Sequence, residues 1–265
     1  MLNREKNNAK LFCIMPAAGK SSRYKKGNKL YDYTLENGNS TVIMNTISSF
    51  LSVGIVEKIF VGYDDANKKS RAFKDDFIEL SAHPENTDFS KVKFIEGGDA
   101  RQETVFNILT FINDKYSDTD KIWVLVHDAA RPCLNGYEIL SFINKTLENN
   151  KSSIMAIPVS DTIKKVDKNL IISETVSREN IWVAQTPQMF KFDVLFQSLK
   201  HCIDMNINIT DESQALEILG HECNVVKGYS HNIKITHDSD IIHGNCIVNH
   251  ISNYYFNNES EENND

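Results

Sequence analysis

Residues 11–23 read Leu-Phe-Cys-Ile-Met-Pro-Ala-Ala-Gly-Lys-Ser-Ser-Arg, and this stretch indicates the fold. The apolar run 11–15 is typical of a strand buried on both faces, and Pro16 ends it because proline lacks the N–H that a sheet ladder needs. The small residues that follow let backbone N–H groups approach a ligand closely, and cations recur as far as Lys29. Amides and cations after a buried strand suit a polyphosphate, although a solvated basic loop has the same composition.

Two known phosphate-binding motifs do not fit this loop. Gly19-Lys20-Ser21 imitates the end of a Walker A motif, but that motif requires a glycine where Ile14 stands. The dinucleotide fingerprint is also absent, since Ser21 and Tyr24 occupy the positions of its second and third glycines. If the loop binds phosphate, it therefore does so through neither of these two motifs.

The size and composition of the chain fit one domain. It has 265 residues, of which 41% are hydrophobic, enough for a sizeable core and for one α/β domain with an excursion. We expect this domain to span residues 11–251. A disordered tail is expected at 1–10 and an acidic tail at 252–265, because both segments are polar.

Charge, cysteines and hydropathy limit the partners of the chain. The net charge of −7 argues against a general affinity for nucleic acid or anionic lipid. The five cysteines are scattered, without metal-ligand spacing, and indicate free thiols in a reducing cytosol. No apolar run approaches the ~18 residues that span a bilayer, and residues 1–10 lack the apolar core of a signal peptide. We therefore expect a soluble, cytoplasmic protein that binds neither nucleic acid nor membrane.

Strand and helix patterns alternate along the first part of the chain. Strands are predicted at 11–15, 56–62, 91–95, 121–126 and 153–159, with helices at 41–51, 65–81, 101–111 and 136–148. This order predicts an α/β fold with a doubly wound, mainly parallel sheet, whose ligands lie beyond the carboxyl ends of the strands.

After residue 159 the pattern changes. Apolar and polar residues alternate about Asp167-Lys168-Asn169, which predicts a protruding β-hairpin arm at about 160–178 that serves as a lid or a dimer arm. The chain then returns to the domain through the elements that the pattern predicts next: a strand at 181–184, a turn at 185–188, helices at 191–202 and 210–219, a strand at 224–227, and a last helix from about 237.

Polar groups at the predicted strand ends are the candidate site residues. Asp128 follows a buried strand, where a carboxylate opposite a polyphosphate cradle suits Mg²⁺; it would equally cap a turn and pair with Arg131. Gly97-Gly98-Asp99 is typical of a tight turn, although bare backbone there would also suit contact with a base edge. The remaining polar groups are more typical of a surface or a helix cap, and these are Thr162, Arg178, Lys234 and Thr210-Asp211-Glu212.

These motifs together resemble a known family. The set comprises Pro16-Ala17-Ala18-Gly19, Gly97-Gly98-Asp99-Ala100-Arg101, Val124 to Pro132, Gln185-Thr186-Pro187-Gln188, Thr210-Asp211-Glu212 and Asn232 to Thr236. In this order they resemble the methylerythritol phosphate cytidylyltransferases, the IspD enzymes of isoprenoid synthesis, which are close relatives of the ribitol phosphate cytidylyltransferases. The resemblance covers about residues 11–240 and implies a Rossmann-like nucleotidyltransferase fold.

The resemblance also implies an activity and its residues. CTP and methylerythritol phosphate would give CDP-methylerythritol and pyrophosphate, with Mg²⁺ held at Asp128, in a homodimer whose hairpin arm completes the partner's site. The implied catalytic residues are Arg23, Lys29, Arg178 and Lys234. The implied substrate-binding residues are Pro16, Ala17, Ala18, Gly19, Gly97, Gly98, Asp99, Thr104, Ala129, Arg131, Thr162 and Thr186.

The chain departs from the family pattern at several positions. Asn28-Lys29-Leu30 replaces Pro-Lys-Gln, Thr104 replaces a serine, and His231 stands where the family commonly has an acidic residue. The last change predicts weaker Mg²⁺ binding or a different acceptor. Two alternatives therefore stay open: a cytidylyltransferase for ribitol phosphate or another polyol phosphate, and a catalytically silent relative that binds nucleotide.

Overall fold

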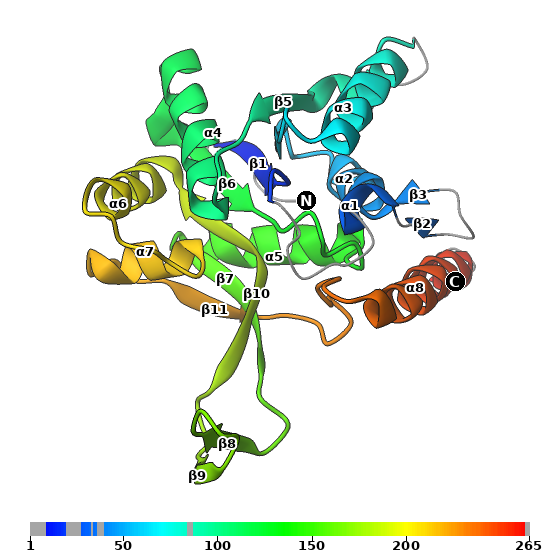
Figure 1. The fold of residues 1–265 in the computed structure, drawn as a ribbon. Coiled ribbons are helices and arrows are strands. Elements are labelled where there is room, and N and C mark those ends of the chain that lie inside the picture. The colour runs from blue at the N-terminus through cyan, green and yellow to red at the C-terminus, as the bar shows by residue number, and fades with distance from the viewer. Residues whose placement is uncertain (1–8, 20–27, 33, 36–39, 84–86, 263–265) are drawn as a thin grey trace.

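The computed structural model describes residues 9–19, 28–32, 34–35, 40–83 and 87–262 (Figure 1). Its centre is a seven-stranded sheet with the order β11-β7-β10-β6-β1-β4-β5. The strands are β1 (Lys10–Pro16), β4 (Lys58–Tyr63), β5 (Val92–Glu96), β6 (Ile122–Val126), β7 (Ser153–Pro158), β10 (Trp182–Lys191) and β11 (Asn224–Lys227). β10 runs antiparallel to both its neighbours, and the other neighbouring pairs are parallel. The predicted α/β fold with a mainly parallel sheet is confirmed.

Helices cover both faces of the sheet. They are α1 (Lys29–Asp32), α2 (Val42–Leu51), α3 (Lys68–Ser81), α4 (Arg101–Lys115), α5 (Gly136–Asn149), α6 (Phe192–Asp204), α7 (Glu212–Ile218) and α8 (Asp238–Glu262). Short elements complete the set: β2 (Thr34–Leu35), β3 (Ser40–Thr41), and the 3-10 turns Thr87–Lys91 and Thr119–Lys121. One core cluster joins the sheet to α2, α3, α5 and α8, and the other joins it to α4, α6 and α7.

β1, an interior strand of the sheet, has an apolar sequence without alternation because both its faces are buried. Leu11, Cys13 and Met15 pack into the first core cluster, whereas Phe12 and Ile14 pack into the second. Successive side chains of a strand point to opposite faces, so a strand that has helices on both sides must be apolar at every position. The sheet therefore carries its strand ends, and the loops that follow them, on a rigid buried scaffold.

Local capping sets the helix starts. The Thr41 side chain accepts a hydrogen bond from the Met44 N–H at 3.3 Å and begins α2, as the sequence predicts. Asn135 and Glu138 form a capping box at the start of α5.

The predicted hairpin arm is present. It consists of β8 (Ile163–Val166) and β9 (Ile172–Val176), which pair antiparallel and project away from the sheet (Figure 1). Leu170, Ile171 and Ile172 near its tip are exposed, Leu170 by 81%. The arm therefore presents apolar side chains to solvent at the end of a projection, which is unusual for a soluble domain.

Two expectations differ from the structure. Residues 185–188 do not form a turn: they lie inside β10, where the register shifts between Ala184 and Gln188. Pro187 is tolerated there because proline is compatible with an irregular position in a strand. α8 continues to Glu262, into the segment expected as an acidic tail, since no Gly or Pro after residue 244 interrupts it. In the described residues, no helix is long and apolar enough to cross a membrane.

Candidate active site

Two loops meet where β1 and β5 end. Ala17 and Ala18 are buried, and the Ala17 N–H donates to the Gly62 carbonyl at 2.9 Å. A Cβ on Gly97 would lie 2.4 Å from the Ala18 Cβ, so this position accepts only glycine if the loops stay in contact. Residues 16–19 and 97–100 are named here the loop pair. The structure thus brings together the predicted residues Pro16 to Gly19 with Gly97, Gly98 and Asp99.

The start of α4 shapes the second loop of the pair. The Gly98 N–H donates to Thr104 Oγ1 at 3.1 Å, and that hydroxyl donates to the Ala100 carbonyl at 3.0 Å. The Asp99 N–H donates to Glu103 Oε2 at 2.9 Å. Thr104, predicted to line a ligand pocket, is therefore buried behind the loop and holds its backbone.

Lys29 is the first residue of α1, a helix that contacts the loop pair through another residue. The hydroxyl of Tyr31 in the same helix contacts the Ala17 carbonyl at 3.4 Å and Ser70 Oγ at 3.1 Å. Arg23, predicted to act with Lys29, lies outside the described residues.

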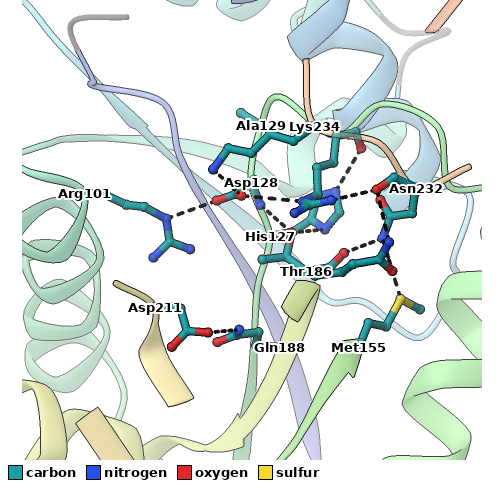
Figure 2. Close-up of polar contacts among 12 residues, drawn as sticks. Arg101, His127, Asp128, Ala129, Met155, Thr186, Gln188, Asp211, Asn232 and Lys234 are labelled. Atoms are coloured by element: carbon teal, nitrogen blue, oxygen red, sulfur yellow. Dashed lines mark hydrogen bonds and ion pairs between the residues drawn. The ribbon is translucent and has the colours of Figure 1, made fainter. Parts of the chain in front are cut away.

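Asp128 is the centre of a charged cluster beyond the end of β6. Oδ1 accepts a hydrogen bond from Arg101 Nε at 3.0 Å, and Oδ2 lies 2.8 Å from Lys234 Nζ and 3.6 Å from Arg131 Nε. Figure 2 shows Arg101 and Lys234 reaching this carboxylate from different sides. Three cations from three separate segments thus converge on one carboxylate, which is only 8% exposed.

The cluster fixes the charge state of its members. Burial alone would raise the pKa of the Asp128 carboxyl, but Arg101, Lys234 and Arg131 more than offset this and hold the pKa well below its usual range. Burial lowers the pKa of the Arg131 guanidinium, and Asp128 opposes the change. The pKa of Arg101 is raised, because Glu212 and Asp128 outweigh the effect of burial. Near neutral pH the Asp128 carboxylate is therefore anionic and is surrounded by three cationic side chains.

A hydrogen-bond relay holds the backbone of Asp128. The Asp128 N–H donates to Thr186 Oγ1 at 3.0 Å, that hydroxyl lies 3.1 Å from His127 Nδ1, and His127 Nε2 lies 3.1 Å from the Arg131 carbonyl. Burial lowers the pKa of His127 to about 4, so the ring is neutral at pH 7. A carbonyl only accepts, so Nε2 carries the hydrogen and Thr186 donates to Nδ1. Thr186, predicted to bind substrate, has its hydroxyl engaged in this relay.

Asn232 ties the segment that carries Lys234 to the same loop. Its side-chain Nδ2 donates to the Thr186 main-chain carbonyl at 2.8 Å, and the main-chain carbonyl of Asn232 accepts from Arg131 Nη1 at 2.6 Å. The Ile235 N–H donates to the Ala130 carbonyl at 2.8 Å. The segment has no regular secondary structure, yet these bonds on both sides of Lys234 place the lysine at Asp128 (Figure 2).

A cavity of about 220 Å³ opens beside this cluster. Its walls come from the starts of α4 and α7, the end of β6, the irregular part of β10 and the segment with Lys234. The lining residues are Arg101, Asp128, Arg131, Ala184, Gln185, Thr186, Gln188, Thr210, Asp211 and Lys234. Most of these side chains are polar or charged, so the cavity suits a small hydrophilic anion better than an apolar ligand. Ala129 is buried next to Asp128 and does not line the cavity.

Two predicted residues are not brought to this cluster within one chain. Thr162 and Arg178 are exposed on the arm, and Arg178 Nη1 donates to the Ser160 carbonyl. Neither residue lines the cavity.

Sequence reasoning missed several residues that build the site. Arg101 and Glu212 form an ion pair beside Asp128, and Gln188 donates to Asp211 Oδ2 at 2.9 Å to join β10 to α7. Both Arg101 and Glu212 lie in motifs that the sequence singled out, but their pairing spans 111 residues of chain. Nothing in the sequence of either motif indicates that these two residues meet.

The described residues contain no group of three or more His, Cys, Asp or Glu side chains arranged to hold a metal ion. At the predicted position the donor is Asp128, whose oxygens already face cations. His231, which stands where an acidic residue was expected, has its Nε2 2.9 Å from Glu138 Oε1. A metal there would need oxygen ligands from elsewhere, such as the phosphates of a bound nucleotide.

Comparison with known proteins agrees with this geometry. The family model described as 2-C-methyl-D-erythritol 4-phosphate cytidylyltransferase (IspD) matches residues 11–250. Proteins of that name from Acinetobacter baumannii (strain AYE) and Haemophilus influenzae (strain PittEE) are each 36% identical, over 91% and 87% of this chain and 94% and 93% of the relatives.

A solved structure gives the same result for the fold. The crystal structure of Francisella tularensis 2-C-methyl-D-erythritol 4-phosphate cytidylyltransferase superposes with a TM-score of 0.71 at 32% identity, over 90% of this chain and all of that one. These matches cover nearly the whole folded chain, and they agree with its motifs and its fold. It therefore belongs to the IspD family, the 2-C-methyl-D-erythritol 4-phosphate cytidylyltransferases.

Proposed function

We propose that this chain joins CTP and 2-C-methyl-D-erythritol 4-phosphate to give CDP-methylerythritol and pyrophosphate, a step in the synthesis of isoprenoid precursors. The observation that carries the proposal is the convergence of Lys234, Arg131 and Arg101 on Asp128, at the same sheet edge as the loop pair. Family membership, and the names of the relatives, support the choice of substrates.

The reaction needs no general base. An oxygen of the acceptor phosphate attacks the α-phosphorus of CTP, and the bond from that phosphorus to the bridging oxygen of the β-phosphate breaks. A phosphate monoester has a second pKa of about 6, so the nucleophile is already ionised at neutral pH. Catalysis then depends on aligning two anions and on stabilising charge as pyrophosphate leaves.

The loop pair is the proposed site for CTP. Its small residues let backbone N–H groups approach the nucleotide, and Gly97 permits the close contact of the two loops. Lys29 enters from α1, and we assign it, together with Arg23, to the phosphates and the departing pyrophosphate. In this arrangement Thr104 and Glu103 keep the loop rigid.

The cavity beside Asp128 is the proposed site for the acceptor. Lys234 and Arg131 supply positive charge at its wall, which suits the phosphate of a polyol phosphate. We assign Thr162 and Arg178 to the same acceptor, but from the arm of a second subunit. The exposed Leu170, Ile171 and Ile172 support a homodimer through the arm, because pairing would remove them from water.

Mg²⁺ fits this site with Asp128 as its protein ligand. Magnesium in phosphoryl transfer is commonly held by one or two carboxylates together with substrate phosphates and water, so a full protein cage is not required. When bound, the ion would neutralise phosphate charge near the α-phosphorus. Lys234 and Arg101 hold the Asp128 carboxylate at the cavity.

Pyrophosphate release tests the proposal. The purified chain is given CTP and Mg²⁺ with either methylerythritol phosphate or ribitol phosphate, and CTP binding is measured separately by calorimetry. Faster release with methylerythritol phosphate supports the assignment. Preference for ribitol phosphate would overturn the acceptor, and CTP binding without release from either acceptor would overturn catalysis.

A further inference from the structure

Glu212 has no role in the reaction proposed above, yet it is the most buried acidic side chain near the site. It is the first residue of α7 and is 0% exposed, whereas the preceding Asp211 is the helix N-cap. Its Oε1 lies 2.5 Å from Arg101 Nη1, and its Oε2 has no hydrogen-bond partner among the described residues. A buried carboxylate is costly unless it is paired, so this contact holds Arg101 firmly.

Arg101 uses another nitrogen to hold Asp128. Its Nε donates to Asp128 Oδ1 at 3.0 Å, so the guanidinium bridges two carboxylates. Because a guanidinium is planar and rigid, fixing Nη1 at Glu212 also fixes the direction in which Nε points. Glu212 therefore determines where Arg101 meets Asp128.

This bridge divides the two oxygens of Asp128 between partners. Oδ1 is bound by Arg101, and Oδ2 faces Lys234 at 2.8 Å and Arg131 at 3.6 Å. Each oxygen of the carboxylate therefore has its own partner, and the contact of Arg101 with Oδ1 leaves Oδ2 facing Lys234. Without Glu212, the Arg101 side chain, which is 29% exposed at the cavity wall, would be free to turn toward solvent or toward substrate phosphate.

We infer that Glu212 is a positioning residue that sets the place of Lys234, acting through Arg101 and Asp128. The inference rests on the proposed function. A displacement of about 1 Å in a positioning group costs up to about 100-fold in rate, so E212Q, which keeps the size of the side chain and removes its charge, should lower kcat about 10- to 100-fold. The affinity for CTP should change less than about 3-fold, because the loop pair is not part of the bridge.

E222Q is the matched control. Glu222 Oε2 lies 2.7 Å from Lys151 Nζ, a comparable ion pair on the surface, and its loss should leave kcat unchanged. The variants R101Q and R101Q/E212Q complete the test. If Glu212 acts only through Arg101, the double variant has the kcat of R101Q, whereas a role in general stability would make the two losses multiply.

Two results would overturn the inference: an E212Q kcat equal to that of E222Q, or losses that multiply in the double variant. If E212Q does not fold, R101Q/E212Q replaces it, since both partners of the ion pair are then removed. A kcat of this double variant near that of the unsubstituted chain would overturn the inference.

Crystal structures of the unsubstituted chain and of E212Q provide a readout independent of turnover. We expect Arg101 Nε to leave Asp128 and Lys234 to shift in the variant, and an unchanged Asp128–Lys234 contact would refute the inference. If the unsubstituted chain releases no pyrophosphate, the proposed function fails, and these two structures still decide the role of Glu212.

Discussion

Substitution of Gly97 by alanine should separate the loop pair and weaken CTP binding. The added Cβ would lie 2.4 Å from the Ala18 Cβ and 2.8 Å from Thr104 Oγ1, all of them atoms on short, buried side chains. Ordinary contact between two carbons needs about 3.5 Å, so the loops must move apart by about 1 Å. Overpacking of this kind costs about 1–3 kcal/mol, which lowers Tm by roughly 2–12 °C in a chain of this size.

The matched control is G54A, because a Cβ on Gly54 would meet no atom within 4 Å. Calorimetric titration of CTP and thermal unfolding are measured on both variants. We expect the Kd for CTP to rise on the order of 10-fold in G97A and to stay constant in G54A, since a 1.4 kcal/mol change is a factor of ten. If G97A binds CTP as tightly as G54A does, the loop pair is not the nucleotide site.

Three further predictions concern the cluster and the arm. K234A should reduce turnover roughly 100- to 1,000-fold and spare CTP binding, because it removes one charged donor from the reaction centre; retained turnover in the release assay would exclude that role. His127 is neutral in the folded chain, where its pKa is about 4, against about 6.5 in the unfolded chain. Between these two pH values the unfolded chain binds one more proton, so the free energy of unfolding should fall by up to about 3 kcal/mol as the pH is lowered from 6.5 to 4. Urea unfolding at pH 7 and pH 4.5 should show a smaller loss for H127Q than for the unsubstituted chain, and equal losses would contradict the assignment. Replacement of residues 163–176 by a short Gly-Ser linker should give a folded monomer that binds CTP without turnover, whereas sedimentation of a dimer would refute the arm's role.

Much of the fold could be predicted because its determinants are local. The unbroken apolar run of β1 indicates burial on both faces, and Thr41 begins α2 where its side chain can cap the helix. The turn predicted at 185–188 was wrong, because these residues lie inside β10. Within β10 the neighbouring strands supply the pairing on both sides, and an irregular register accommodates the proline.

The site was predicted less completely, because its contacts join distant segments. Asp128 was placed correctly at a strand end, and Lys234 reaches it, but nothing local to Glu212 indicates a pair with Arg101. Locally, Thr210-Asp211-Glu212 predicts a helix cap, and Asp211 does cap α7. That Thr186 binds Asp128 and His127 through its hydroxyl also depends on the packing of β10 against β6.

The central claim is that the cluster around Asp128 aligns a polyol phosphate with CTP. The most direct measurement is the rate of pyrophosphate release from CTP and Mg²⁺ with methylerythritol phosphate, for the unsubstituted chain, for K234A, and for K151A as a surface control. The account predicts rapid release by the unsubstituted chain and K151A and a loss of at least about 100-fold in K234A. Equal rates in all three, or CTP binding with no release by the unsubstituted chain, would contradict it.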